Sequence, residues 1–369
     1  MKVAVVGAGF QGRLHVEYLS ALDDVEVVAV CDPDAARADE VAAAFGIDRV
    51  YSDYRRALDA HDLDLVTVCT MPVLHRQVTV DALDAGAHVL CEKPLAMNAA
   101  EGREMLDAAQ AAGRLLTVGF NLRHTRSAQI LKRFVNRSGF GDPVYTRAWG
   151  KASQIPWWGQ HYRRDISGGG ALAATAVHLV DLALWLAGHP TPTTVSASMR
   201  RLFPTKRGQT APDDEAAASF DAEDLLSAHV RFDNGFWMTV EASWIDNKPS
   251  VDGAPSWDYS FDAIGERAQL QFDPLVIAVE DEDGEIVSAV DPEDVPGVSF
   301  PDSLAALIRD VVDSIRSSRP PVVRAEEALV VQSIVDAIYA SAAVDREVTV
   351  DLPPKGIDAV GPTRSPMPD

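Results

Sequence analysis

A glycine-rich turn near the first residue has the spacing of a phosphate-binding loop. Gly7, Gly9 and Gly12 fit G-x-G-x-x-G, between an apolar run at 3–6 and a helical pattern. The first glycine allows a tight turn, the second lets a pyrophosphate reach the backbone, and the third lets the helix pack on the strand. The free N–H groups at the helix start favour phosphate. The sequence predicts a dinucleotide site, with an unliganded structural loop as the alternative. Its residues are Gly7, Gly9, Phe10, Gln11 and Gly12.

An acidic residue stands where the ribose of such a cofactor would need one. Asp32 ends the second apolar run, about 20 residues after Gly12, which is the spacing of a ribose-binding acid. Its carboxylate can accept hydrogen bonds from the ribose hydroxyls and repels a 2′-phosphate, so NAD is favoured over NADP. Two alternatives stay open, namely a plain turn at 32–34 and a phosphate-binding role for Arg37 that would make NADP possible.

A lysine follows a later strand at the edge where a doubly wound sheet binds its ligand. Lys93 stands in Glu92-Lys93-Pro94, directly after the apolar run His88–Cys91. Near a cationic nicotinamide and partly out of water, a lysine has a lowered pKa and can act as an acid or hydrogen-bond donor. A simple turn is the alternative interpretation.

A histidine follows a run of glycines. Gly168–Gly170 opens a helical pattern in which residues 174, 178 and 181 share one face. The glycines would allow a ligand to approach closely, so His178 is a candidate general base. The alternative is a buried core histidine.

Aromatic residues gather just before these glycines, with His161, Arg163 and Arg164 between them. Sugars stack their C–H faces on aromatic rings while polar groups bind their hydroxyls, so this segment is a candidate pocket wall. Packing of the rings in the core is the alternative. The aromatic residues are Trp149, Trp157, Trp158 and Tyr162.

The first 120 residues alternate short apolar runs with Ala-rich helical patterns that end at glycine. Such runs are typical of parallel strands buried on both faces, and the alternation predicts an α/β doubly wound sheet. The predicted strands are Lys2–Val6, Val25–Cys31, Leu65–Cys69, His88–Cys91 and Leu115–Phe120. The predicted helices are Asp34–Phe45, Val73–Ala85 and Ala99–Ala112, the last begun by a capping box of Asn98 and Glu101.

After residue 123 the pattern changes to mostly antiparallel strands with helices on one side, an α+β domain. We therefore expect domains at 1–122 and 123–350, a poorly ordered tail at 351–369, and a surface loop at Lys206–Asp224. The predicted strands are Pro143–Ser153, Thr194–Leu202, Leu225–Phe232, Phe236–Trp244, Ser256–Ile264 and Arg267–Phe272. The predicted helices are Gly170–Leu186, Leu304–Ser317 and Ala325–Val344.

In these segments the sequence resembles the glucose–fructose oxidoreductase/inositol dehydrogenase/MocA (Gfo/Idh/MocA) family. The resemblance spans roughly residues 1 to 350 and lies in the order of its motifs. These are Gly7–Gly12, the turn from Thr70-Met71-Pro72 to His75, Glu92-Lys93-Pro94, Gly168–Gly170 with His178 and Asp181, and the stretches Gly119–Arg123 and Ala337–Ser341.

The resemblance implies an N-terminal Rossmann domain and a second domain with a large open antiparallel sheet, whose face commonly mediates oligomerisation. It implies that Lys93 and His178 flank the reacting carbinol. Many relatives carry an acid four residues before the histidine, where this chain has Ala174. Residues implied near the cofactor are Thr70, Pro72, His75, Glu92 and Lys93, and those near the substrate are Arg123, Trp157, Tyr162, Arg163 and His178.

Composition narrows the partners. With 33 basic and 55 acidic residues among 369, the net charge is -22, which disfavours nucleic acid and anionic membranes. Three cysteines, no secretory signal and no apolar run near the ~18 residues of a membrane span predict a cytoplasmic protein without a metal site. Apolar side chains on both faces of the strand around Phe236, Met238 and Val240 predict a homodimer or homotetramer.

The function that these features predict is an NAD(P)-dependent dehydrogenase or reductase acting on a secondary alcohol of a sugar, cyclitol or related polyol. Two alternatives remain. One is NAD-assisted glycoside cleavage through transient oxidation, and the other is a regulatory protein that binds dinucleotide and sugar without turnover.

Overall fold

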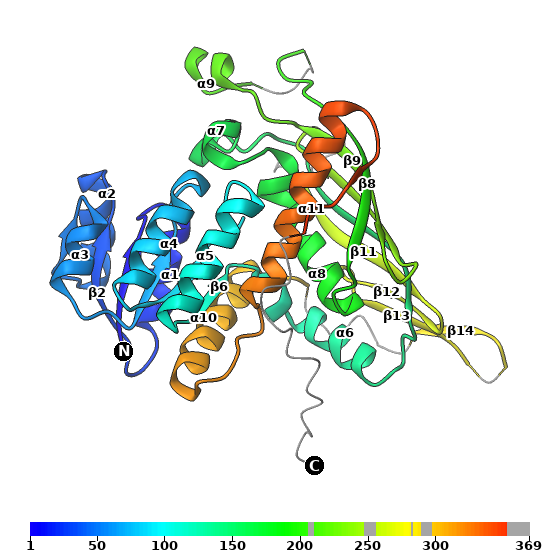
Figure 1. Ribbon diagram of the computed structural model, residues 1–369, viewed down its shortest axis with the longest axis horizontal. Coiled ribbons are helices and arrows are strands. Elements are labelled where there is room, and N and C mark those ends of the chain that lie inside the picture. Colours follow the sequence, from blue (N-terminus) through cyan, green and yellow to red (C-terminus); the bar gives the residue numbers. More distant parts are fainter. Residues whose placement is uncertain (206–209, 247–255, 282, 289–296, 353–369) are drawn as a thin grey trace.

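Two β-sheets lie side by side, each with its own helices (Figure 1). The computed structural model describes residues 1–205, 210–246, 256–281, 283–288 and 297–352. The predicted tail at 351–369 therefore lies almost entirely outside the described residues. Figure 1 shows the first sheet in blue and cyan, and the second and larger sheet in green and yellow.

The first sheet is parallel and has the strand order β3-β2-β1-β4-β5-β6. This confirms the predicted doubly wound fold, because the order reverses at β1 and β4, where such folds bind their ligands. β3 was not predicted, since two residues are too few to make a periodic pattern. The strands are β1 Lys2–Val6, β2 Glu26–Cys31, β3 Val50–Tyr51, β4 Leu65–Val68, β5 His88–Cys91 and β6 Leu116–Val118.

The helices at 35–45 and 99–112 begin at polar capping side chains and end at the predicted glycines, Gly46 and Gly113. The Asp34 side chain accepts the Arg37 N–H, and the Asn98 side chain accepts the Glu101 N–H. The Glu101 carboxylate returns to the Met97 N–H, so the reciprocal bond of the capping box falls one residue earlier than predicted. The predicted helix from residue 73 begins as a 3₁₀ turn, and α3 was not predicted. The elements are α1 Phe10–Ser20, α2 Ala35–Phe45, α3 Tyr54–Ala60, η1 Pro72–Leu74, α4 His75–Asp84 and α5 Ala99–Ala112.

In the described part of the chain, the second sheet has nine strands in the order β14-β13-β12-β11-β7-β10-β9-β8-β15. All of its pairs are antiparallel except β7 with β10, and the predicted hairpin joins β9 to β10. The strands are β7 Pro143–Ala152, β8 Pro192–Arg200, β9 Leu225–Phe232, β10 Trp237–Ser243, β11 Trp257–Gly265, β12 Ala268–Gln271, β13 Val276–Glu280, β14 Ile286–Ser288 and β15 Val348–Thr349.

Helices cover one face of this sheet and leave the other open (Figure 1). α8 Val177–Ala187 contacts β7 and β11, and α11 Ala325–Val344 contacts β8. Met238 and Val240 of β10 point to the covered face and are fully buried. Trp237 points to the open face and is 37% exposed.

The chain returns to the first sheet near its end. Helix α10 Phe300–Ser317 contacts α1 and the 3₁₀ turn η2 Asn121–His124. We propose that the two domains meet near residue 122, with α10 as a late addition to the surface of the first.

The described part of the predicted loop Lys206–Asp224, residues 210–224, contains a helix and buried carboxylates. Residues 206–209 lie outside the description, but α9 Asp214–Ser219 is a helix whose N-terminus is capped by Asp213. Glu223 and Asp224 are buried, at 4% and 0% exposed. The acidic composition suggested a solvated loop, whereas these two carboxylates accept backbone N–H groups inside the fold.

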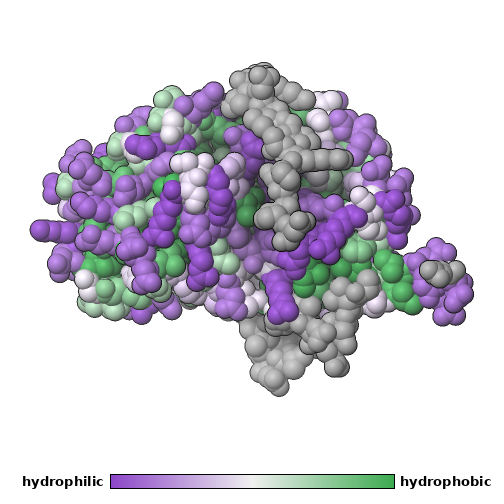
Figure 2. All heavy atoms as spheres, turned by 90° about the horizontal axis from the view of Figure 1, so that it is seen from below, coloured by the Kyte–Doolittle hydropathy of each residue, from purple (hydrophilic) through white to green (hydrophobic). Residues whose placement is uncertain are grey.

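Two helical stretches are long and apolar enough to cross a membrane by length and composition, namely Arg164–Ala187 and Ala325–Val344. The apolar windows of these stretches are 83% and 56% buried inside the fold, which fits core helices. Seen from below, the surface is mostly hydrophilic, with hydrophobic residues gathered in smaller areas (Figure 2).

Candidate active site

One cleft of about 1060 Å³ runs from the glycine turn to Lys93 and His178. That volume lies at the upper end of ligand pockets, so the cleft has room for more than one small molecule. Ten of the residues predicted for the site line it: Gly7, Gly9, Phe10, Gln11, Asp32, Thr70, Pro72, Glu92, Lys93 and His178.

The glycine turn has the shape that a pyrophosphate requires. Gly7 has φ +98°, and a Cβ there would lie 2.4 Å from the Cys69 carbonyl oxygen. A Cβ on Gly12 would lie 1.7 Å from the Gly7 carbonyl oxygen, so that glycine serves the packing of α1 on β1. A Cβ on Gly9 would meet nothing within 4 Å, because Gly9 borders the open cleft. The three glycines therefore fit the predicted cofactor.

Asp32 is held rigidly at the end of β2. Its Oδ2 accepts the Ala8 N–H at 2.8 Å and its Oδ1 accepts the Asp34 N–H at 2.9 Å. Each oxygen keeps a second lone pair, and the residue lines the cleft, so ribose hydroxyls could still bind. Arg37 also lines the cleft, with Nη1 3.6 Å from Asp32 and Nη2 3.0 Å from Asp34.

Glu92 and the buried His15 form an ion pair under the cleft wall. The His15 Nε2 lies 3.0 Å from the Glu92 Oε1, which also accepts from Gln11 at 3.3 Å. Burial alone would lower the pKa of His15, but Cys69 and Glu92 raise it to about 10. Burial alone would raise the pKa of Glu92, but His15 and Lys93 lower it to about 2. The Glu92 Oε2 accepts the Lys93 N–H at 3.2 Å, so the pair fixes the backbone that carries Lys93.

Burial largely removes Lys93 and His178 from water. The Lys93 Nζ donates to the Ala174 carbonyl oxygen at 2.8 Å, and burial lowers the pKa of this lysine. Burial and the charge of Lys93 together lower the pKa of His178 to about 3. The imidazole is therefore neutral at pH 7 and is 8% exposed, and its buried Nδ1 has no hydrogen-bond partner among the residues that the structure describes.

The helix of His178 begins with a π-helical turn, η4 Leu172–Ala176, which sequence periodicity did not predict. Ala174 lies in this turn and lines the cleft, and its carbonyl oxygen accepts the hydrogen bond from Lys93. The Thr175 Oγ1 instead accepts from the Trp244 Nε1 at 2.9 Å.

Two sequence profiles together match most of the chain. Residues 1–120 match the profile described as "Oxidoreductase family, NAD-binding Rossmann fold", and residues 128–271 match the "GFO/IDH/MocA C-terminal domain". D-glucoside 3-dehydrogenase of Escherichia coli (strain K12) is 30% identical over 345 residues, which are 93% of this chain and 95% of that protein. The chain belongs to the Gfo/Idh/MocA oxidoreductase family.

Solved structures agree with this assignment. An NAD binding oxidoreductase from Klebsiella pneumoniae superposes with a TM-score of 0.81 at 25% identity, covering 96% of this chain and 99% of the other. Levoglucosan dehydrogenase in complex with NADH and levoglucosan has the same fold, with a TM-score of 0.82 at 23% identity and coverages of 95% and 100%. The first domain of this oxidoreductase is an NAD-binding Rossmann domain.

The glycine run of this oxidoreductase serves packing, which corrects the predicted role in ligand approach. A Cβ on Gly169 would lie 2.0 Å from the Tyr339 hydroxyl, and one on Gly170 would lie 2.1 Å from the Glu223 carbonyl oxygen. The Glu223 carboxylate accepts the N–H groups of Gly170 and Leu172 at 2.8 and 2.9 Å. Glu223 thereby fixes the start of the segment that carries His178.

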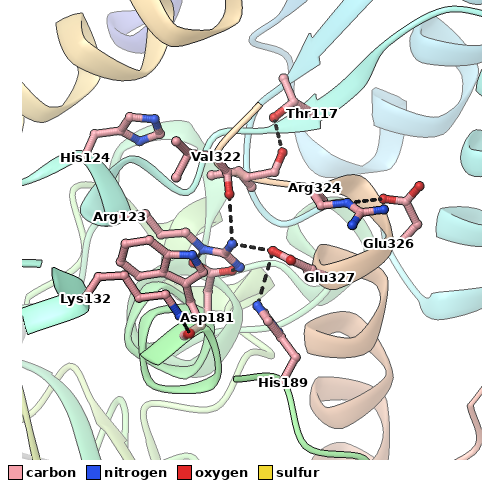
Figure 3. Close-up of polar contacts among 12 residues, drawn as sticks. Thr117, Arg123, His124, Lys132, Asp181, His189, Val322, Arg324, Glu326 and Glu327 are labelled. Atoms are coloured by element: carbon pink, nitrogen blue, oxygen red, sulfur yellow. Dashed lines mark hydrogen bonds and ion pairs between the residues drawn. The ribbon is translucent and has the colours of Figure 1, made fainter. Parts of the chain in front are cut away.

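Arg123 lies in the core, which corrects its predicted place at the substrate. Its Nε and Nη2 donate to the two oxygens of Asp181 at 2.8 and 2.6 Å, and Nη1 donates to Glu327 (Figure 3). Arg123 and Asp181 are both 0% exposed. Asp181 follows His178 by three residues on the same helix, but it is not part of the cleft lining.

Four other predicted residues also lie away from the cleft lining. The His75 imidazole lies 2.8 Å from the Pro94 carbonyl oxygen and 3.1 Å from that of Thr70, so it joins two loops that border the cleft. Trp157 and Tyr162 pack with each other and with Phe220 in an aromatic cluster. Arg163 pairs with its near neighbour Asp165.

Two residues of the predicted pocket wall, Trp158 and His161, line the cleft. The structure adds Trp257 and Tyr259, which the sequence did not single out for the site. Burial and the nearby charge of Lys93 lower the pKa of His161 to about 4, so a second neutral imidazole faces the cleft. Among the described residues, no group of three or more His, Cys, Asp or Glu side chains is placed to hold a metal ion.

Proposed function

We propose that this protein is an NAD-dependent dehydrogenase or reductase of a secondary alcohol in a sugar, cyclitol or related polyol. The observation that carries the proposal is the meeting of Lys93 and a neutral His178 in one cleft with the dinucleotide turn. The names of the relatives support the substrate class, because they act on a glucoside and on levoglucosan.

His178 and Lys93 have different roles at the substrate hydroxyl. The nicotinamide supplies or accepts the hydride when the cofactor is bound. The neutral His178 would take the hydroxyl proton during oxidation. The Lys93 ammonium has three donors and gives one to Ala174, so two remain to stabilise a developing alkoxide. The same charge that lowers the pKa of His178 also lowers the pKa of the hydroxyl, so proton transfer between them stays feasible.

The test is to incubate the protein with NAD and a panel of sugars, glycosides and cyclitols while following nicotinamide absorbance. Steady reduction supports a dehydrogenase. Glycoside hydrolysis without net reduction would support cleavage through transient oxidation. Binding of NAD and sugar with no chemistry would support a regulatory protein and overturn the proposal.

Asp32 supports a preference for NAD within this proposal. Its carboxylate lies at the cleft wall with both oxygens anchored by backbone N–H groups, so it cannot move far from a 2′-phosphate. Arg37 is engaged by Asp34 and Asp32 and would have to leave them to bind that phosphate.

The open face of the large sheet supports a homodimer or homotetramer. Trp237 and Tyr145 pack there with ring centroids 5.5 Å apart, beside the pair Arg147–Glu241. Burying such a face in a second copy would remove apolar surface from water. A monomer by light scattering at micromolar concentration would contradict this. The three free cysteines accord with a cytoplasmic location.

A further inference from the structure

The outer end of the cleft carries a row of aromatic rings. Trp257 and Tyr259 are two residues apart on β11, so both point to the same face of the sheet. Their rings are stacked, with centroids 5.6 Å apart and an interplanar angle of 11°. The Trp158 ring continues the row at 6.2 Å from Trp257. We call Trp158, Trp257 and Tyr259 the aromatic platform.

The aromatic platform starts beside the reaction centre. Tyr259 pairs in register with Gly150, and its hydroxyl lies beside Thr175, the residue after the one whose carbonyl holds Lys93. From there the rings become more exposed, because Tyr259 is half-buried while Trp257 and Trp158 are 43% and 60% exposed. The row therefore leads from Lys93 towards solvent along one wall of the cleft.

Trp158 lines the cleft, whereas its neighbour Trp157 is partly buried against the core. The Trp157 ring packs against Tyr162, Phe203 and Phe220 at 5.1 to 5.8 Å. Trp158 begins a 3₁₀ turn in which Gly159 has φ +64°, and the Trp158 ring lies on the cleft side. Two tryptophans that stand together in the sequence thus have different roles.

Exposed tryptophans at a cleft mouth leave apolar surface in water until a ligand covers them. Polar side chains border these rings, since Gln160, His161 and Asp273 line the same cleft. Flat apolar faces with hydrogen-bonding groups beside them match a pyranose ring, which has apolar C–H faces and hydroxyls on its edge.

We propose that the aromatic platform is a subsite for a second ring, so that the preferred substrate is a glycoside rather than a free monosaccharide. The reacting sugar lies at Lys93 and His178, and its sugar or aryl aglycone stacks on Trp257 and Trp158. This rests on the proposed function, because the reacting ring is placed by its two catalytic residues.

The test compares paired probes, namely methyl and phenyl glycosides of several aldoses together with disaccharides of the same aldoses. We expect kcat/KM for the two-ring probe to exceed that of the methyl glycoside by about 5- to 10-fold, the size of a stacking contact. Trp158→Ala and Trp257→Ala should abolish this ratio, and Trp158→Tyr should restore most of it. Ile286→Ala is the control, because Ile286 is 73% exposed and lies on β14, outside the cleft lining.

A binding measurement separates the two proposals. Two-ring glycosides should quench the tryptophan fluorescence of the protein saturated with NAD, and Trp158→Phe should reduce that quench. If glycosides are oxidised with equal kcat/KM whatever the aglycone, the platform proposal is wrong and the proposed function stands. If no probe reacts, the proposed function is wrong. The quench of tryptophan fluorescence by two-ring glycosides then tests by itself whether the aromatic platform binds a second ring. Quenching by acrylamide that rises on dilution would show that a second copy covers these rings, which would overturn the subsite.

Discussion

The buried pair of Arg123 and Asp181 offers the sharpest test of how the second domain is held together. Arg123→Met removes a guanidinium that donates twice to Asp181 and also donates to Glu327 and to the Val322 carbonyl (Figure 3). Asp181 is 0% exposed, so the substitution leaves a carboxylate with neither its partner nor water. Removing one member of a buried ion pair costs about 3–5 kcal/mol, which is why we expect a large loss of stability.

That loss is measurable as a melting temperature. At about 2 °C per kcal/mol for a long chain, Arg123→Met should lower Tm by roughly 6–10 °C. The double variant Arg123→Met/Asp181→Leu should recover much of this, because no charge is then stranded at position 181. Arg324→Met is the matched control in the same region. Its pair with Glu326 is exposed and spans 3.6 Å, so its loss should cost under about 1 kcal/mol.

Kinetics then distinguish a core arginine from a substrate-binding one. At temperatures well below Tm, Arg123→Met should keep a KM for the sugar close to that of the unmodified protein, because the guanidinium does not line the cleft. A variant with unchanged Tm and a strongly raised KM would refute this reasoning. That result would support the role in substrate binding that the sequence predicted for Arg123.

Four further outcomes are expected. Asp32→Ser should reduce the preference for NAD over NADP, measured as the ratio of their kcat/KM values, by the equivalent of roughly 1–3 kcal/mol. An unchanged ratio would mean that Asp32 does not bind the ribose. His178→Ala should lose about 10²–10⁴-fold in kcat/KM and Lys93→Ala at least as much, measured by nicotinamide absorbance; near-normal turnover would exclude them. Because the pKa of His178 is lowered to about 3, its protonation should reduce the rate of alcohol oxidation only near that pH. Ala174→Asp should shift this acidic part of the pH–rate profile to higher pH. An unshifted profile would mean that residue 174 does not act on the imidazole. Burial alone would raise the pKa of Glu327, but the nearby imidazole and guanidinium groups lower it to about 2. The ionised Glu327 therefore stabilises the folded state fully above about pH 4.5, and this contribution is lost as the pH falls towards 2. The difference in unfolding free energy between the native chain and Glu327→Gln should therefore shrink on acidification, and a constant difference would contradict the assignment.

Local rules in the sequence were enough for the first domain and the cofactor turn. Buried parallel strands, glycine-ended helices and the G-x-G-x-x-G turn each depend on residues close together in the chain, so their pattern predicts their structure. Asp32 and Lys93 follow from the same logic, because the ends of neighbouring parallel strands meet at one edge of the sheet. β3 and α3 were missed because they are too short to show a period.

The sequence by itself thus determined the fold class and the dinucleotide turn, and it singled out Lys93 and His178, which the structure brings into one cleft. Only the tertiary structure decided which way the other polar and aromatic side chains face. Arg123 turns into the core because Asp181 and Glu327 from distant helices meet it there. Trp157 is partly buried because Phe203 and Phe220 pack against its ring, whereas Trp158 lines the cleft. The physical reason is that a residue type sets what a side chain can do, whereas long-range packing sets what it can reach.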